Sequence, residues 1–175
     1  MIIIISGATH TGKTALAQKI LERAHFPYLS QDHLKMGLIR AEETQLTPED
    51  DGQLTPYLWK ITKEIIKTAL ENKQNLIVEG CYIPFDWQAS FSAGDLAEIK
   101  FICLVLSKKY IEQSFAEIKM HANVMEQRLD DSDCTKEFLI AENTRYLKGC
   151  QSAQLDYHLV AKRYDVGDYL NEFIR

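Results

Sequence analysis

The sequence predicts an α/β fold: a mostly parallel β-sheet with helices on both faces. Short apolar runs typical of buried strands alternate along the chain with longer segments of helical periodicity. A glycine-rich loop directly follows the first apolar run. The chain has 175 residues, enough for one well-packed domain and too few for two of typical size. We therefore expect residues 1–175 to form a single domain.

A strand, a glycine-rich loop and a helix are predicted in immediate succession at the N-terminus. Four consecutive isoleucines at 2–5 are stiff and β-branched, which predicts a buried strand. Residues 13–24 carry apolar side chains at helical spacing. Between them, residues 7–14 read Gly-Ala-Thr-His-Thr-Gly-Lys-Thr, the G-x-x-x-x-G-K-[ST] pattern of a phosphate-binding P-loop.

The residue types of this loop suit a bound phosphate. Gly7 and Gly12 permit backbone angles and close approaches that a Cβ would block. A lysine in the first turn of a helix opposes the helix dipole, so Lys13 is better explained by a bound anion. The Thr14 hydroxyl is expected to bind Mg²⁺. The residues expected to contact the phosphates are Gly7, Ala8, Thr9, His10, Thr11, Gly12, Lys13 and Thr14.

Strand and helix signals then alternate. Residues 26–29 predict a short second strand, and helical sequence follows over about 33–45. Two Thr-Pro pairs, at 47–48 and 55–56, each favour a helix start, and an apolar stripe runs from the second pair to Asn72. The remaining elements are a strand at 75–80, an irregular segment at 81–97, a strand at 99–106, a helix at 108–128, a charged loop at 129–134, a helix at 135–150, a strand at 157–160 and a helix at 166–174.

Two acids follow predicted strands and should lie near the loop, because ligands bind beyond the carboxyl ends of such strands. Asp32 follows the second strand. It could take the proton of an acceptor hydroxyl or orient that hydroxyl, and it could also cap the next helix. Glu79 ends the third strand, where it could contact Mg²⁺ together with Thr14, or the acceptor. The alternative for Glu79 is a solvent-facing acid.

Three arginines are further candidates. Arg128 and Arg145 flank the charged loop, which predicts a lid at about 128–135 that closes over the donor and neutralises transition-state charge. Ordinary surface arginines are the alternative. Arg40, on the helix after Asp32, could bind an anionic group of the acceptor.

Composition excludes several classes. The net charge is −5 with no basic block, which argues against a nucleic-acid partner. No run approaches the roughly 18 apolar residues of a membrane span, and the first apolar run lacks the basic start of a secretory signal. The four cysteines have no C-x-x-C spacing, which favours free thiols in the cytoplasm. The histidines show no metal-binding pattern, and nothing indicates an oligomeric state.

Over essentially its full length, the chain resembles P-loop kinases of the adenylate-kinase-like group. The shared features are the P-loop, Asp32, Glu79-Gly80 and the arginine-flanked lid. The resemblance implies the P-loop NTPase three-layer sandwich with a five-stranded parallel sheet in the order 2-3-1-4-5, a helical lid, an acceptor-binding insert at about 33–97, and ATP with Mg²⁺. Cys81-Tyr82-Ile83-Pro84 stands where adenylate kinases carry Phe-Pro-Arg, which argues against a nucleoside monophosphate as acceptor.

The surroundings of Asp32 and Val78-Glu79-Gly80 look closer to zeta-toxin-like and 2-phosphoglycerate-kinase-like proteins, which phosphorylate hydroxyls of sugars or small metabolites. We therefore expect a small-molecule kinase in which Lys13, Asp32, Arg128 and Arg145 are catalytic. The alternatives are an ATP-binding protein without transferase activity and a sugar-nucleotide kinase of the zeta-toxin kind.

Overall fold

In a computed structural model, which describes residues 1–125 and 134–162, one sheet of five parallel strands organises the chain. The strand order is β2-β3-β1-β4-β5, so the predicted fold class and sheet order are confirmed. The strands are β1 (Ile2–Gly7), β2 (Tyr28–Ser30), β3 (Leu76–Gly80), β4 (Ile99–Leu106) and β5 (Tyr157–Val160).

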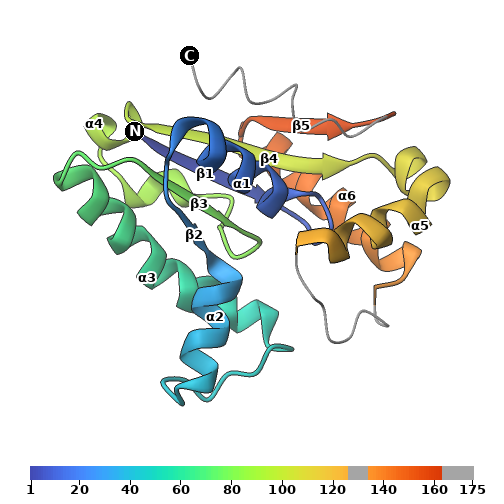
Figure 1. Cartoon of the computed structure of the whole chain (residues 1–175), viewed down its shortest axis with the longest axis horizontal. Coiled ribbons are helices and arrows are strands. Elements are labelled where there is room, and N and C mark those ends of the chain that lie inside the picture. The colour runs from blue at the N-terminus through green and yellow to red at the C-terminus, as the bar shows by residue number, and fades with distance from the viewer. Residues whose placement is uncertain (126–133, 163–175) are drawn as a thin grey trace.

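Helices connect the strands and pack on both faces of the sheet (Figure 1). Helix α1 packs on one face, while α3 and α6 pack on the other. The helical elements are α1 (Lys13–Ala24), α2 (Gln31–Arg40), α3 (Asp51–Glu71), η1 (Trp87–Ser90), α4 (Ala93–Leu96), α5 (Lys108–Met125) and α6 (Lys136–Ser152).

The four isoleucines of β1 are fully buried because this strand lies at the centre of the sheet. Ile3 and Ile5 contact the α1 side, whereas Ile2 and Ile4 contact the core beneath α3 and α6. Alternate side chains of a strand point to opposite faces, so a strand covered on both faces needs apolar residues at every position.

The α2–α3 region differs from the sequence prediction. Helix α2 runs over Gln31–Arg40 instead of about 33–45, and α3 begins at Asp51, one turn before the predicted start at Thr55. Pro56 therefore lies inside α3, and the Thr55 hydroxyl donates to the Asp51 carbonyl at 3.1 Å instead of capping the helix.

The first Thr-Pro pair forms a turn, not a helix. The Asp50 N–H donates to the Thr47 carbonyl at 3.1 Å, which closes a turn with Pro48 at its favoured second position. The Asp50 carboxylate accepts from the Thr47 N–H at 2.8 Å and from its hydroxyl at 2.9 Å. These hydrogen bonds lower the pKa of Asp50 and leave Asp50 as the N-cap of α3.

Several predictions fall outside the described residues: the charged loop up to residue 133, the end of the helix before it, and the closing helix at 166–174. The irregular segment at 81–97 holds only the short elements η1 and α4, as expected. Within residues 1–125 and 134–162, no helix is long and apolar enough to cross a membrane.

Candidate phosphate and acceptor site

The P-loop joins β1 to α1 at the carboxyl edge of the sheet. Gly7 has φ 144° and Gly12 has φ 82°, backbone angles that favour glycine. A Cβ on Gly7 would also collide with the Leu104 carbonyl oxygen on β4 and lie 3.0 Å from the Thr11 hydroxyl. His10 shares the left-handed region, with φ 62°. Such runs of unusual backbone angles form the concave loops of N–H groups that bind anions.

Hydrogen bonds to one carbonyl brace this loop. The Ala8 carbonyl accepts from the Thr11 hydroxyl at 2.9 Å and from Lys13 Nζ at 2.8 Å. Lys13 is 8% exposed, so its ammonium is held within the loop instead of extending into solvent. Helix α1 carries no acid of its own in its first turn, so its own side chains leave the positive end of its dipole open to an anion. Loop, lysine and helix terminus thus suit a phosphate group.

Glu79 reaches the P-loop through the pairing of β1 with β3. The register sets Glu79 opposite Ile5, and Glu79 is only 1% exposed, so the predicted alternative of a solvent-facing acid is wrong. The Thr14 hydroxyl donates to Glu79 Oε2 at 3.4 Å. A hydroxyl and a carboxylate are the oxygen ligands that Mg²⁺ uses beside substrate phosphates, so the residues present fit this ion.

Asp32 lies in the first turn of α2, on the other side of β3 from the P-loop. Ser30, which pairs with Glu79 in the β2–β3 register, is the N-cap residue, so the capping role considered for Asp32 is wrong. The side chain of Asp32 is 41% exposed, and Lys35 Nζ lies 2.9 Å from its Oδ1. Lys35 did not stand out in the sequence.

The start of α2 is held against the chain that follows β3. Gln31 is fully buried; its Oε1 accepts from the Tyr82 N–H at 3.0 Å, and its Nε2 donates to the Tyr82 carbonyl at 3.3 Å. The Gln31 side chain crosses directly over Gly80, where a Cβ would lie 2.6 Å from the Gln31 Cβ. Gly80 is therefore required by this close approach and not by a positive φ.

Gly80→Ala is expected to destabilise the protein by about 1–3 kcal/mol, because the added methyl group overpacks the Gln31 contact. Gly37→Ala is the matched control: nothing lies within 4 Å of the position, and alanine in a helix should stabilise by about 0.5–1 kcal/mol. Urea unfolding measures both changes in the free energy of unfolding. Equal effects of the two substitutions would contradict the packing role of Gly80.

Tyr82 connects Lys35 to the start of α3. Lys35 Nζ donates to the Tyr82 hydroxyl at 2.9 Å, and that hydroxyl donates to Asp51 Oδ1 at 2.9 Å. Burial raises the pKa of Tyr82, and the neighbouring groups, Asp51 and Asp32 among them, raise it further, so the hydroxyl keeps its proton. Burial likewise raises the pKa of the Cys81 thiol to about 11, against the opposing charge of Lys13.

The predicted arginines do not gather at this edge among the described residues. Arg145, on α6, pairs with Glu142 through two hydrogen bonds of 3.2 and 2.7 Å, which raise its pKa. Its guanidinium stacks 4.6 Å from the centre of the Tyr146 ring. Arg40 is the exposed last residue of α2, roughly 12 Å along the helix axis from Asp32. Arg128 lies outside the described residues.

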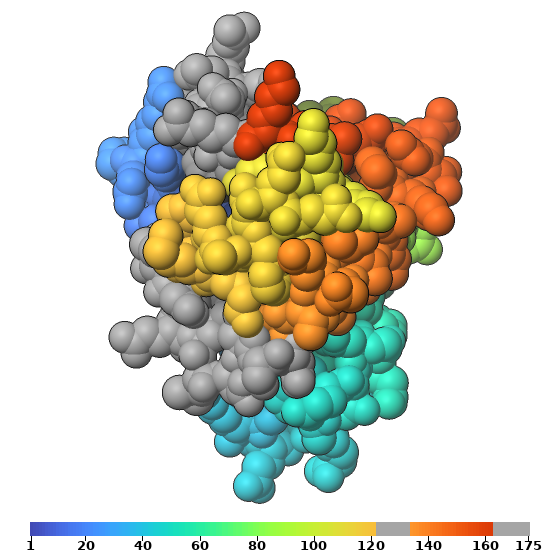
Figure 2. Space-filling view, turned by 90° about the vertical axis from the view of Figure 1, so that its right-hand side faces the viewer, coloured from blue at the N-terminus to red at the C-terminus, as the bar shows by residue number. Residues whose placement is uncertain are grey.

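Helix α6 nevertheless approaches the site. The Tyr146 hydroxyl donates to the Cys81 carbonyl at 2.6 Å, just beyond β3. Figure 2 views the molecule from the carboxyl edge of the sheet, with α5 and α6 across the middle and the segment joining α2 to α3 at the bottom. Arg145 is therefore next in sequence to Tyr146, which contacts the segment that follows β3.

No family model and no curated protein matches this chain. Solved structures do match it over almost its whole length. A deoxyadenosine kinase from M. mycoides matches with a TM-score of 0.60 at 14% identity, over 99% of this chain and 97% of that one. The chain has the fold of the P-loop kinases.

Two other kinases show the same likeness. A sugar kinase from Janibacter sp. matches with a TM-score of 0.54 at 11% identity, covering 99% of this chain and 91% of that one. A gluconokinase from Sinorhizobium meliloti matches with a TM-score of 0.51 at 14% identity, covering 97% and 87%. At such identities the likeness establishes the fold of these P-loop kinases and not the substrate.

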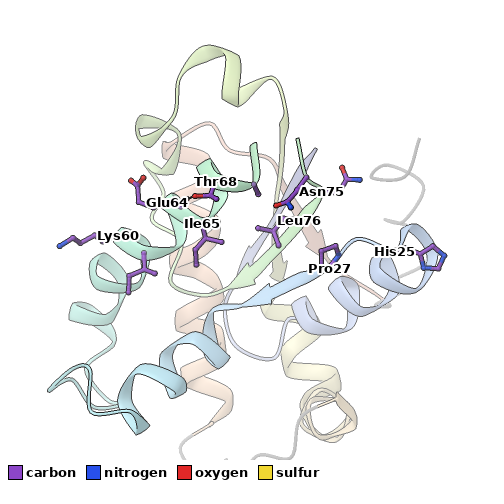
Figure 3. Close-up of a pocket in the computed structure, with 11 residues that line it drawn as sticks. His25, Pro27, Lys60, Glu64, Ile65, Thr68, Asn75 and Leu76 are labelled. Carbon is purple, nitrogen blue, oxygen red and sulfur yellow. Dashed lines mark hydrogen bonds between the residues drawn. The ribbon is translucent and has the colours of Figure 1, made fainter. Parts of the chain in front are cut away.

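A groove of about 760 Å³ lies elsewhere on the molecule (Figure 3). It is lined by α3 residues such as Ile65 and Thr68 and by Pro27 and Leu76, which stand where β2 and β3 begin. These are the amino ends of the strands, whereas the P-loop, Glu79 and Asp32 follow the carboxyl ends. The groove is therefore separate from the candidate site.

Proposed function

We propose that this protein is a kinase that transfers the γ-phosphoryl group of Mg·ATP to a hydroxyl of a small metabolite or sugar derivative. One observation carries the proposal. The P-loop hydroxyl of Thr14 lies 3.4 Å from the buried carboxylate of Glu79 on β3. The partly exposed carboxylate of Asp32 lies in the first turn of α2, the helix that follows the neighbouring strand β2. A phosphate loop flanked by two acids suits phosphoryl transfer.

The P-loop residues would hold the donor. The backbone N–H groups of residues 7–14 and the positive end of α1 would bind the β- and γ-phosphates, with Lys13 as the adjacent cation. Thr14 and Glu79 would hold Mg²⁺, with Glu79 acting directly or through water. When bound, Mg²⁺ neutralises charge on the phosphate oxygens.

Asp32 is the candidate general base. Its carboxylate would accept the proton of the acceptor hydroxyl as that oxygen bonds to the γ-phosphorus. The bond from this phosphorus to the β–γ bridging oxygen breaks, and ADP leaves. Arg128 and Arg145 are the candidates for stabilising the charge that develops, and Arg145 would have to exchange Glu142 for a phosphate oxygen. Arg40 could reach only an acceptor that extends far along α2.

We propose a single domain at 1–175, with an acceptor-binding insert at about 33–97 and a lid at about 128–135. We propose the cytoplasm as the compartment, because the cysteines at 81, 103, 134 and 150 have no C-x-x-C spacing. We propose a small-molecule partner and no nucleic acid. The M. mycoides deoxyadenosine kinase, whose fold this chain shares, has been solved with bound dATP, which supports a nucleotide as the ligand of the P-loop.

A ³¹P NMR screen tests the proposal. Mg·ATP is mixed with the protein and with sugars, nucleosides, glycerates or sugar nucleotides, and the expected result is a new phosphate-ester resonance with one acceptor class. Thermal shifts report binding separately, because a ligand at 100 times its Kd stabilises the native state by about 2.7 kcal/mol. Nucleotide binding without transfer to any class would favour the ATP-binding alternative. Transfer to sugar nucleotides alone would favour the zeta-toxin-like one.

A further inference from the structure

Four side chains form a continuous hydrogen-bonded chain from the candidate base to the start of α3. Asp32 Oδ1 lies 2.9 Å from Lys35 Nζ, which lies 2.9 Å from the Tyr82 hydroxyl, which in turn lies 2.9 Å from Asp51 Oδ1. The four residues come from α2, α3 and the segment after β3. The proposed phosphate and magnesium contacts do not explain why these four side chains are connected.

Tyr82, in the middle of this hydrogen-bonded series, is its most rigid member. Tyr82 is 3% exposed, packs with Leu54 and Leu58 of α3, and has both backbone polar groups bonded to Gln31. Its hydroxyl accepts from Lys35 and donates to Asp51, so the direction of the hydrogen bonds is fixed.

Lys35 is nearly as constrained. Its side chain is 13% exposed, and an ammonium at that depth needs partners for its charge. Asp32 pairs with this ammonium directly. Asp51 balances its charge indirectly, because Asp51 accepts a hydrogen bond from the Tyr82 hydroxyl to which Lys35 donates. With its ammonium 5.0 Å from the centre of the Tyr82 ring and two of its three donors engaged, Lys35 holds that ammonium at one place beside Asp32.

Asp32 itself is 41% exposed, so packing alone does not fix its carboxylate. A general base must face the acceptor oxygen within hydrogen-bond reach, and small misplacements of a reacting group have large effects on rate. Resting on the proposed function, we propose that Lys35 is a positioning residue that fixes the Asp32 carboxylate through the buried Tyr82–Asp51 pair.

The test is a double-mutant cycle between Lys35→Met and Asp32→Asn, measured as kcat with the acceptor found in the screen. Alone, Lys35→Met should lower kcat about 10-fold and leave KM for Mg·ATP within about twofold, because a misaligned base slows the chemical step without loosening the P-loop. In the Asp32→Asn background, the same change should lower kcat less than twofold. A merely structural lysine would lower kcat equally in both backgrounds.

Lys67→Met is the matched control. Lys67 forms the same i,i+3 pair with Glu64, at 3.0 Å on α3, with the two side chains 35% and 58% exposed, so the substitution removes an equal charge outside the site. We expect wild-type kcat from it. If Lys35→Met does not fold, Tyr82→Phe takes its place in the cycle: it keeps the buried ring and cuts the anchor of Lys35, with an expected fall of about threefold.

The outcomes separate the inference from the proposed function. Equal falls in kcat in both backgrounds, or no fall in the wild-type background, would overturn the role of Lys35 and leave the kinase proposal intact. Wild-type protein that transfers to no acceptor would overturn the proposed function, and the inference with it. A fall confined to the background that retains Asp32 would support both.

Discussion

Asp32→Asn should lower kcat by about 100-fold or more and leave Mg·ATP affinity nearly unchanged, because the amide cannot accept the hydroxyl proton while the P-loop is untouched. The change is nearly isosteric, and the Asp32 side chain is 41% exposed, so the substitution should not disturb the packing. Lys35 loses its ion pair with Asp32 but keeps its hydrogen bond to the Tyr82 hydroxyl. Steady-state kinetics with the acceptor and calorimetric titration with Mg·ATP measure the two quantities.

Asp156→Asn is the control for this prediction. Asp156 is exposed and directly precedes β5, at the amino edge of the sheet, so its neutralisation changes the net charge without touching the carboxyl edge. Full activity of Asp32→Asn would remove this residue from the chemistry. A parallel loss of nucleotide binding would instead assign it to the donor side.

Lys13→Ala should lower transfer by about 10²–10³-fold and weaken Mg·ATP binding, because it removes the buried cation from the P-loop. The lysine is held 2.8 Å from the Ala8 carbonyl, next to the N–H groups that would bind phosphate. Unlike Asp32→Asn, this substitution should affect donor affinity and turnover together. Calorimetry and single-turnover transfer distinguish the two patterns.

Lys19→Ala serves as the control on the same helix, since Lys19 is exposed and lies well past the first turn of α1. Circular dichroism and urea unfolding should give matching folded states for both variants. Wild-type affinity and turnover in folded Lys13→Ala protein would contradict the phosphate role of residues 7–14.

Contiguous features were predictable because their physical basis is local. The P-loop is one uninterrupted segment, and four adjacent β-branched isoleucines, all of them buried, favour a strand that is covered on both faces. The strand-end position of Glu79 also followed from sequence, because the carboxyl ends of parallel strands share one edge. The strand order came from resemblance, since periodicity does not tell which strands are neighbours.

Helix starts were predicted less well where two local signals competed. Thr47-Pro48 and Thr55-Pro56 both look like helix caps, yet the Asp50 carboxylate binds Thr47 and α3 starts between the two pairs. The sequence could exclude neither pair as a helix start, because both fit the local preference for a threonine N-cap and a proline at the first helical position.

The sequence by itself determined a phosphate loop, its strand and helix, and an acid at the end of another strand on the same edge of the sheet, because these depend on adjacent residues and on the direction of parallel strands. Only the tertiary structure decided that Lys35, Tyr82 and Asp51 meet beside Asp32, that Gly80 makes room for Gln31, and that Tyr146 of α6 contacts the Cys81 carbonyl. These contacts join residues that are 31 to 65 positions apart, so they depend on how α2, α3 and α6 pack against the sheet.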